Sequence, residues 1–247
     1  MGAIGIDVGG SGIKAAVVDL ATGTFTGERV RVDTPTPATP DAVVSATRAL
    51  IAPFPGGLPV GVGFPAPVIA GVTTTAAHVD HGWVGAPARD LFTRGLGRPV
   101  AVLNDADAAG IAEARFGAAR GHPGVVILLT LGTGIGSAVM HGGVLLPNTE
   151  LGHVEVRGVE AEARAAAAVR EREGLSWAAW AERLSEVITV IDGILWPDLV
   201  ILGGGVSRKA ARFIPLLDVR PPVMAAVLEN RAGIIGAAAV AAGDVRT

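Results

Sequence analysis

The sequence has no cysteine, only two lysines and no long uninterrupted apolar run. The lack of cysteine excludes disulfides and thiolate metal sites, and it fits a reducing compartment. Proline and glycine interrupt the apolar stretches before they reach the roughly 20 residues of a spanning helix, so we expect no membrane segment. The first residues lead into a strand pattern without a basic segment or cleavage site, so we expect no export signal and a cytoplasmic location.

The chain is long enough, at 247 residues and 50% apolar composition, for one large or two small domains with a real core. The net charge of −3 does not favour nucleic acid or anionic membranes as partners. The order of apolar runs and amphipathic segments predicts an α/β protein with two similar sheets. Strands are expected at 4–8, 13–19, 60–64, 100–103, 125–131, 136–140 and 199–202, and helices at 40–51, 105–116, 160–173, 177–195 and 232–242.

Two glycine-rich turns, at residues 7–12 and 130–136, are the most informative features of the sequence. Each follows a strand pattern and leads into a second strand pattern, whereas a dinucleotide or Walker loop leads into a helix. Glycine lets the backbone approach an anion, so that successive N–H groups can point at phosphate oxygens. The pair therefore predicts phosphate-binding hairpins, one in each half of the chain, with ordinary hairpin turns as the alternative.

Asn104 and Asp105 stand where an apolar strand pattern ends and a helix pattern begins. Ligands of open α/β sheets gather at such strand ends. An ionised aspartate there can accept the proton of a hydroxyl group that attacks phosphorus. The alternative is that Asp105 and Asp107 only cap the helix.

Glu150 and His153 follow the second hairpin and could accept hydroxyl protons from one polyhydroxylated ligand. A metal site is the alternative, disfavoured by the lack of cysteines and of a nearby ligand cluster, and a surface glutamate with a core histidine is another. The turn at 63–67 could present backbone to a ligand, and the turn at 203–205 could lie under a nucleotide or phosphate chain.

Seven segments together resemble the ROK family of sugar kinases, within the actin-like ATPase superfamily, and most of all its actinobacterial polyphosphate glucokinase branch. The segments occur in family order over essentially the whole chain. They are GIDVGGSGIK (5–14), TAAHVD (75–80), LNDADAAG (103–110), LTLGTGIGSA (129–138), PNTELGH (147–153), WPDLVILGGGVSRK (196–209) and AGIIGAA (232–238).

The resemblance implies an actin-like ATPase (ribonuclease H-like) fold, in which two α/β domains border a cleft. A small N-terminal domain of residues 1–103 plus 232–247 and a larger domain of residues 104–231 are expected. The implied activity is Mg²⁺-dependent phosphorylation of the glucose 6-hydroxyl by polyphosphate, ATP or both, with mannose as a second candidate acceptor, in a homodimer.

The residues and the resemblance leave three other functions to consider. An ATP-only kinase for another hexose or an N-acetylhexosamine is the alternative enzyme, and a catalytically silent sugar-binding protein is the non-enzyme alternative. ROK repressors carry a DNA-binding helix-turn-helix before the first loop; only a short strand pattern precedes Asp7 here, which disfavours that function.

The resemblance also implies residue roles. Asp105 corresponds to the catalytic base, and Asp7 to the aspartate that holds Mg²⁺ through water. The implied sugar ligands are Asn104, Asp105, Glu150, His153, Glu160 (or Glu162 in its place), Gly63 and Pro65. The implied donor-binding residues are Asp7, Gly9, Gly10, Ser11, Gly12, Lys14, Thr130, Gly132, Thr133, Gly134, Gly203, Gly204 and Gly205.

Three departures from the family pattern bear on specificity. The cysteine-rich zinc motif of most ROK kinases is absent, so we expect no zinc. Ala66 replaces a glycine and His78 replaces an asparagine beside the sugar, which leaves the choice of hexose open. A polyphosphate donor also needs a cationic track, whose candidates are Lys14, Arg115, Arg120, Arg157, Arg208, Lys209 and Arg212.

Overall fold

The computed structural model describes residues 2–76 and 79–243, so His78 lies outside the described residues. Its contacts divide the chain into two units, Met1–Ala112 with Arg231–Thr247, and Glu113–Asn230. The boundary expected from the sequence was residue 104, with the larger domain after it. The division instead falls within α3 (Asp105–Phe116) and makes the N-terminal unit the longer one. The reason is that the first half of α3 packs against α7 (Ala232–Ala241) of the N-terminal unit.

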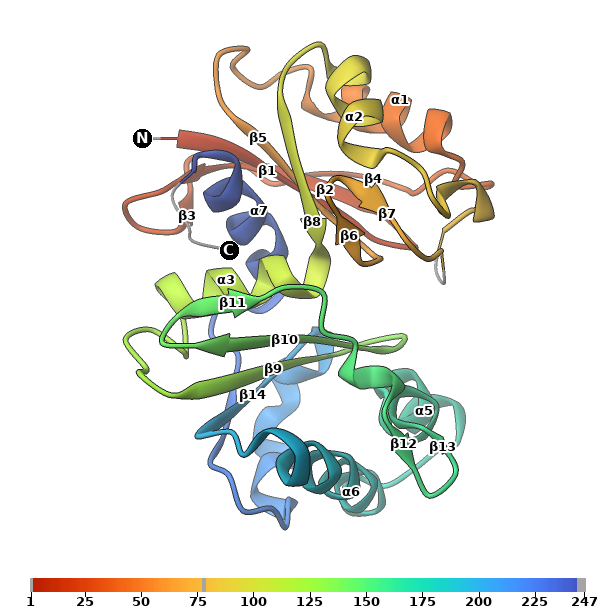
Figure 1. The fold of residues 1–247 in the computed structure, drawn as a ribbon, viewed down its shortest axis with the longest axis vertical. Coiled ribbons are helices and arrows are strands. Elements are labelled where there is room, and N and C mark those ends of the chain that lie inside the picture. Colours follow the sequence, from red (N-terminus) through yellow and green to blue (C-terminus); the bar gives the residue numbers. More distant parts are fainter. Residues whose placement is uncertain (1, 77–78, 244–247) are drawn as a thin grey trace. The chain divides into compact units, whose positions relative to one another are not determined.

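The N-terminal unit is built on a six-stranded sheet in the order β3-β2-β1-β5-β8, with β4 beside β2 (Figure 1). β1 and β2 form an antiparallel hairpin, and β5 and β8 run parallel to β1. The strands are β1 (Gly2–Val8), β2 (Ile13–Asp19), β3 (Thr24–Phe25), β4 (Val30–Val32), β5 (Val60–Phe64) and β8 (Val100–Asn104). The unit also contains α1 (Pro40–Ile51), a small hairpin of β6 (Val68–Ile69) and β7 (Val72–Thr73), the 3₁₀ turn η1 (His81–Trp83) and α2 (Ala88–Leu96). Of these, α2 and the short strands were not predicted.

Helix α7 lies across β1 and β5 at unusually close range (Figure 1). A Cβ atom on Gly5 would overlap the Ile234 carbonyl, and one on Gly61 would overlap the Ala237 carbonyl. A Cβ on Gly236 would likewise overlap the Ala108 carbonyl of α3. Because no side chain separates these backbones, the first turn of α7 is held next to the end of β1.

The second unit repeats this plan around a five-stranded sheet in the order β11-β10-β9-β14-β15. β9 (Val125–Leu131) and β10 (Ile135–His141) form an antiparallel hairpin, and β14 (Leu199–Gly203) runs parallel to β9. The other elements are β11 (Val144–Leu146), η2 (Leu151–His153), β12 (Glu155–Val156), β13 (Val159–Glu160), α4 (Ala161–Ala165), α5 (Ala167–Arg172), α6 (Trp177–Leu195), η3 (Gly205–Arg212), η4 (Ile214–Leu216), β15 (Val223–Ala225) and η5 (Glu229–Arg231). Both glycine-rich turns therefore connect antiparallel strands, as the sequence predicted.

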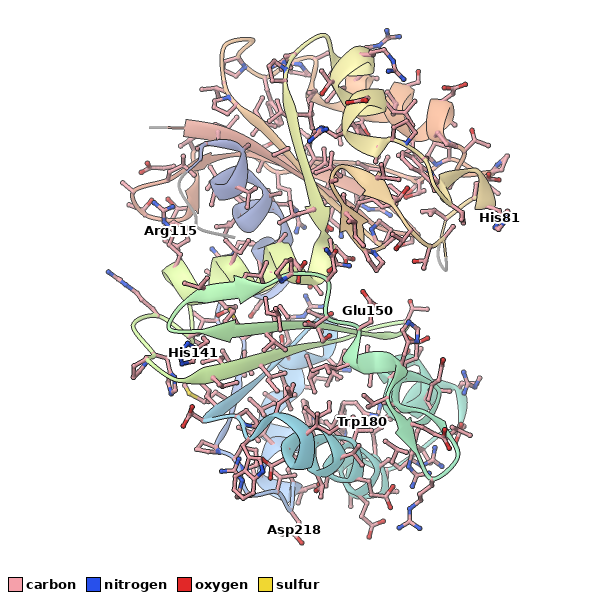
Figure 2. All side chains as sticks on the ribbon, in the orientation of Figure 1. His81, Arg115, His141, Glu150, Trp180 and Asp218 are labelled. Carbon is pink, nitrogen blue, oxygen red and sulfur yellow. The ribbon has the colours of Figure 1, made fainter. Side chains whose placement is uncertain are left out.

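Helix α6 supplies most of the helical core of this unit. Ser176 caps its N-terminus by accepting a hydrogen bond from Ala179 N. Trp180, labelled in Figure 2, is fully buried against Phe213 and donates its indole N–H to the Ala165 carbonyl. The buried residues along α6 thus form part of the core, whereas Ile194 near the end of the helix is 62% exposed.

The prediction of one helix over residues 160–173 is wrong, because two short helices, α4 and α5, occupy this range. The backbone of Ala166 has ψ 154°, which separates α4 from α5. Ala168 N donates to the Gly132 carbonyl instead of continuing the helical pattern. Among the described residues, we find no helix whose length and apolar character would let it cross a bilayer.

Glu113 is fully buried at the start of the second unit. Its Oε2 accepts from Ala118 N at 2.7 Å and its Oε1 accepts from Leu228 N at 2.8 Å. Leu228 lies near the last residue of the unit, so one carboxylate connects its two ends. Buried charged groups are tolerated when such bonds compensate for lost hydration.

We expect Glu113→Ala to lower the free energy of unfolding by about 3 to 5 kcal/mol, because it leaves two backbone N–H groups without acceptors. Urea unfolding followed by tryptophan fluorescence measures this loss. Glu182→Ala, at an exposed position of α6, is the control and should change stability by less than about 0.5 kcal/mol. Equal midpoints for both variants would contradict the role of Glu113.

Candidate functional site

Three residues of the N-terminal unit meet at the carboxyl ends of its parallel strands. Asp7, near the end of β1, is in register with Gly63 of β5, and Gly63 is in register with Leu103 of β8. A Cβ on Gly63 would lie 3.5 Å from the Asp105 Cα, so Gly63 and Asp105 are in close proximity. The edge of one sheet therefore carries both aspartates that the sequence analysis selected.

Asp7 is paired with Lys14 across the β1–β2 hairpin. Lys14 Nζ lies 3.1 Å from Asp7 Oδ2, and the two side chains are 28% and 19% exposed. Lys14 is thus a partly buried partner of Asp7 rather than a solvated surface lysine. On the other side of Asp7, its Cγ would lie 3.5 Å from a Cβ on Gly233, near the N-terminus of α7. A helix N-terminus favours negative charge at that point.

The first glycine turn is closed by its own backbone and by two neighbouring side chains. Gly9 N donates to the Gly12 carbonyl at 3.1 Å. The Thr34 hydroxyl donates to the Gly9 carbonyl at 2.5 Å, and Arg31 donates to the Ser11 carbonyl at 3.1 Å. Sequence reasoning missed Thr34 and Arg31, since neither belongs to a motif. The carbonyl groups of the turn thus accept hydrogen bonds from within the protein, while Gly10 and Ser11 are exposed.

The N-cap of α3 is Asn104 rather than Asp105. The buried Asn104 Oδ1 accepts from Ala106 N at 2.8 Å and from Asp107 N at 3.0 Å. Asp105 Oδ1 accepts from Ala106 N at 2.8 Å, and its side chain is only partly buried. The capping role that the alternative assigned to Asp105 therefore belongs mainly to Asn104, whose amide keeps two N–H donors for other groups.

The turn after β5 places Pro65 and Ala66 beside this edge. Ala66 is 3% exposed and its N–H donates to the Phe64 carbonyl at 2.8 Å. Ala66 is not among the positive-φ residues of the chain. Alanine therefore fits at the position where the family pattern has glycine.

In the second unit, the second and third glycine turns are adjacent. Gly132 N donates to the Gly134 carbonyl at 3.0 Å, and both Gly132 and Thr133 are exposed. Gly204 has φ 82°, and a Cβ there would overlap the Leu131 carbonyl. The end of β14 can therefore approach the end of β9 only with glycine at this position.

Glu150, His153 and Glu160 form a connected chain of side chains. His153 Nε2 lies 3.6 Å from Glu150 Oε2, and His153 Nδ1 lies 3.4 Å from Glu160 Oε1. Burial raises the pKa of the Glu150 carboxyl, the nearby His153 opposes this rise, and the charge of Glu162 adds to it. Figure 2 labels Glu150 at the entrance to η2. Three groups that can exchange hydrogen bonds with sugar hydroxyls thus lie together.

Two backbone contacts fix this chain of side chains. The Ser137 hydroxyl of β10 donates to the Thr149 carbonyl and accepts from Leu151 N at 2.9 Å. A Cβ on Gly152 would overlap the Ile135 carbonyl, so η2 lies directly on β10. Ser137 was missed as a supporting residue, although it lies in the segment 129–138 that carries the family resemblance.

The expectation that no ligand cluster lies near Glu150 and His153 was wrong. The structure brings His153, Glu160 and Glu162 together, with one ligand atom from each within 4.8 Å of the others. Glu162 Oε2 also accepts from Ile135 N at 3.4 Å. Glu160 therefore faces His153, whereas Glu162 contacts the second glycine turn.

The candidate cations for a polyphosphate track do not have equivalent surroundings. Lys14 is paired with Asp7, Arg157 with Glu186, and Arg115 lies over the Phe116 ring at 4.9 Å. The remaining candidates are exposed. Of these, Arg208, Lys209 and Arg212 lie on η3, which begins in the third glycine turn, and Arg120 lies in a turn after α3.

Comparison with known proteins identifies the class. The ROK family model matches residues 3–167, and the chain belongs to the ROK family. The sequence is 52% identical to polyphosphate glucokinase of Mycobacterium tuberculosis over 241 residues, which are 97% of this chain and 91% of that protein.

Solved structures agree with this assignment. The inorganic polyphosphate/ATP-glucomannokinase from Arthrobacter sp. strain KM matches with a TM-score of 0.94 and 48% identity over 98% of both chains. A ROK family glucokinase from Streptomyces griseus, solved with glucose and AMPPNP, matches with a TM-score of 0.84 and 26% identity over 98% of this chain and 100% of that one. The predicted actin-like ATPase fold is confirmed.

The raised pKa of Glu150 predicts a pH-dependent stability. The folded protein holds the Glu150 proton more tightly than the unfolded chain, so stability falls as pH rises above the ordinary glutamate pKa of about 4.3. We expect wild type to lose free energy of unfolding as the pH rises from about 4 to about 7, and Glu150→Gln to lose less. The stability of the variant relative to wild type should therefore increase over this range. Urea midpoints at both pH values measure this. Glu171→Gln, at an exposed residue of α5, should show no such gain, and a Glu150→Gln variant that behaves like it would refute the prediction.

Proposed function

We propose that this protein transfers the terminal phosphoryl group of inorganic polyphosphate or ATP to the 6-hydroxyl of glucose. The observation that carries the proposal is the placement of Asp105 beside Gly63 at the strand edge that also holds Asp7. Similarity to polyphosphate glucokinase over 97% of the chain supports the substrate pair. The assay that tests it combines glucose or mannose with polyphosphate or ATP, with and without Mg²⁺.

In this proposal Asp105 is the general base. Its carboxylate accepts the 6-hydroxyl proton while that oxygen forms a bond to the transferred phosphorus, and the phosphorus–oxygen bond to the donor breaks. The proton moves to Asp105, and the negative charge leaves with the shortened donor. Asn104 fixes the start of α3 and directs amide N–H donors toward the sugar.

The sugar is bound in this proposal by Glu150, His153 and Glu160, with backbone contacts from Gly63 and Pro65. Glu160 is favoured over Glu162 because it is the glutamate that pairs with His153. The raised pKa of Glu150 suits a group that exchanges hydrogen bonds with hydroxyls. Because the carboxylates and imidazole contact one another, they can bind hydroxyls without large side-chain rearrangement.

The donor phosphates are bound by the backbone N–H groups of the glycine turns. We assign this role to Gly9 to Gly12 with Ser11 in the N-terminal unit, and to Thr130 to Gly134 with Thr133 in the second unit. The turn at Gly203 to Gly205 would lie under the rest of the donor. Such preformed N–H groups stabilise the charge of the transition state without reorganisation.

Asp7 fits the Mg²⁺ ion that the family implies. Its carboxylate is partly exposed at the strand edge, and Mg²⁺ in phosphoryl-transfer enzymes takes one or two carboxylates together with water and phosphate oxygens. When bound, the ion would neutralise phosphate charge. Lys14, 3.1 Å from Asp7, keeps that carboxylate oriented and adds positive charge nearby.

The family resemblance also supports a homodimer located in the cytoplasm. Ile194 and Trp196, at the end of α6, are 62% and 68% exposed. These apolar side chains are available to a second subunit, whereas Trp180 is occupied in the core. The tryptophans of the helix itself therefore serve mainly the core in this proposal.

We expect Asp105→Asn to lower kcat by about three orders of magnitude, because asparagine cannot accept the hydroxyl proton. Glucose binding measured by isothermal titration should change by less than about threefold, since shape and hydrogen-bonding capacity are kept. Asp90→Asn, at an exposed residue of α2, is the matched control and should retain full activity. Near-normal turnover of Asp105→Asn would exclude it as the base.

We expect the triple change Arg208→Ala, Lys209→Ala and Arg212→Ala to raise the KM for long-chain polyphosphate about tenfold, and the KM for ATP less than about threefold. The polyanion extends beyond the glycine turns and ATP does not. The defect should shrink as salt is added, since screening weakens the wild-type contacts.

A control with the same loss of charge removes three exposed arginines of the N-terminal unit, Arg29, Arg48 and Arg94. Its KM for polyphosphate should match wild type. If both triple variants lose polyphosphate affinity equally, net charge rather than a track on η3 explains donor binding.

A further inference from the structure

The second glycine turn is attached at both of its sides to one short segment of the chain. On the near side, the Gly132 carbonyl accepts from Ala168 N at 3.0 Å. On the far side, Ile135 N donates to Glu162 Oε2 at 3.4 Å. Both partners belong to the α4–α5 segment, residues 161–172. The turn is therefore held by an element some thirty residues later in the sequence.

The same segment is attached to the side chains that we assign to the sugar. Glu160 immediately precedes α4 and meets His153 at 3.4 Å. Ala161 N donates to the Val154 carbonyl at 2.8 Å, which fixes the start of α4 to the end of η2. Ala161 and Ala165 are fully buried, so α4 is anchored in the core and has little freedom to shift.

The break between α4 and α5 allows the hydrogen bonds to Gly132 and to Ile135 to form at the same time. Ala166 leaves the helical conformation, and Ala168 N becomes available to the Gly132 carbonyl. Glu162 remains within α4, where its side chain reaches Ile135. One uninterrupted helix would have used the Ala168 N–H internally.

A carboxylate beside a phosphate-binding turn is repelled by the donor, so Glu162 is poorly suited to contact the donor itself. It is well suited to accept a backbone N–H, because a hydrogen bond to a charged acceptor is stronger than one to a neutral group. Ile135 is the first residue of β10 and lies two residues after Thr133, which is exposed in the turn. The bond therefore fixes the point at which the turn rejoins the sheet.

We propose that Glu162 is a positioning residue that fixes the second phosphate turn relative to the His153–Glu160 pair, so that one short helix sets the spacing between donor and sugar. This inference rests on the proposed function for what the two sides bind. It gives Glu160 and Glu162 different roles: Glu160 contacts the sugar, and Glu162 acts through the Ile135 N–H on the donor turn.

Glu162→Ala and Glu162→Gln test this role. The alanine variant should raise the KM for ATP and for polyphosphate about tenfold, while the glucose dissociation constant from titration changes less than about threefold. The glutamine variant keeps an acceptor oxygen and should restore most of the donor KM. Glu171→Ala, an exposed glutamate of α5, is the matched control and should resemble wild type.

Hydrogen exchange of the peptide that spans residues 131–136 provides a readout independent of activity. The Ile135 amide should exchange faster in Glu162→Ala than in wild type, and protection should return in Glu162→Gln. Unchanged exchange, or an equal loss of donor and glucose affinity, would overturn the positioning role. A wild-type protein that shows no glucose phosphorylation would refute the proposed function instead, whatever the exchange result.

Discussion

The parallel register of β1, β5 and β8 is the constraint on which the candidate site of the N-terminal unit depends. It puts Asp7, Gly63 and Asp105 at one sheet edge although they are far apart in the sequence. Helix α7 contacts the backbone of the sheet at Gly5 and Gly61, and this close packing places the N-terminus of the helix beside Asp7. Larger residues at these glycines would push the helix away and remove its favourable field from the carboxylate.

The second unit uses the same plan with a different result. Its hairpin and parallel strand again end in glycine turns, and Gly204 allows the turn after β14 to touch Leu131. β14 and β15 run parallel to β9, as β5 and β8 run parallel to β1, but the segment after the second hairpin carries acidic groups and a histidine. Repetition of one strand pattern thus gives two glycine turns between antiparallel strands, whereas the side chains around them differ between the units.

Charge distribution distinguishes the two groups of residues. Lys14 Nζ lies 3.1 Å from Asp7 Oδ2, so a cation stands within hydrogen-bonding distance of this carboxylate. Glu150 and Glu160 both lie close to His153, and burial together with the charge of Glu162 raises the pKa of Glu150, which His153 opposes. The first arrangement suits an ion and a phosphate group, and the second suits neutral hydroxyls. This contrast agrees with a kinase whose acceptor is a sugar and whose donor is an anion.

The sequence by itself determined the long elements and the turns, because periodic apolar patterns and glycine spacing are local properties. The predicted bounds of α1, α3 and α6 match those observed, and both glycine turns are hairpins. Only the tertiary structure decided that Thr34 supports the first turn and that Glu162 contacts Ile135. Those contacts join residues through folding of distant segments, and no local pattern encodes which distant side chain completes a hydrogen bond.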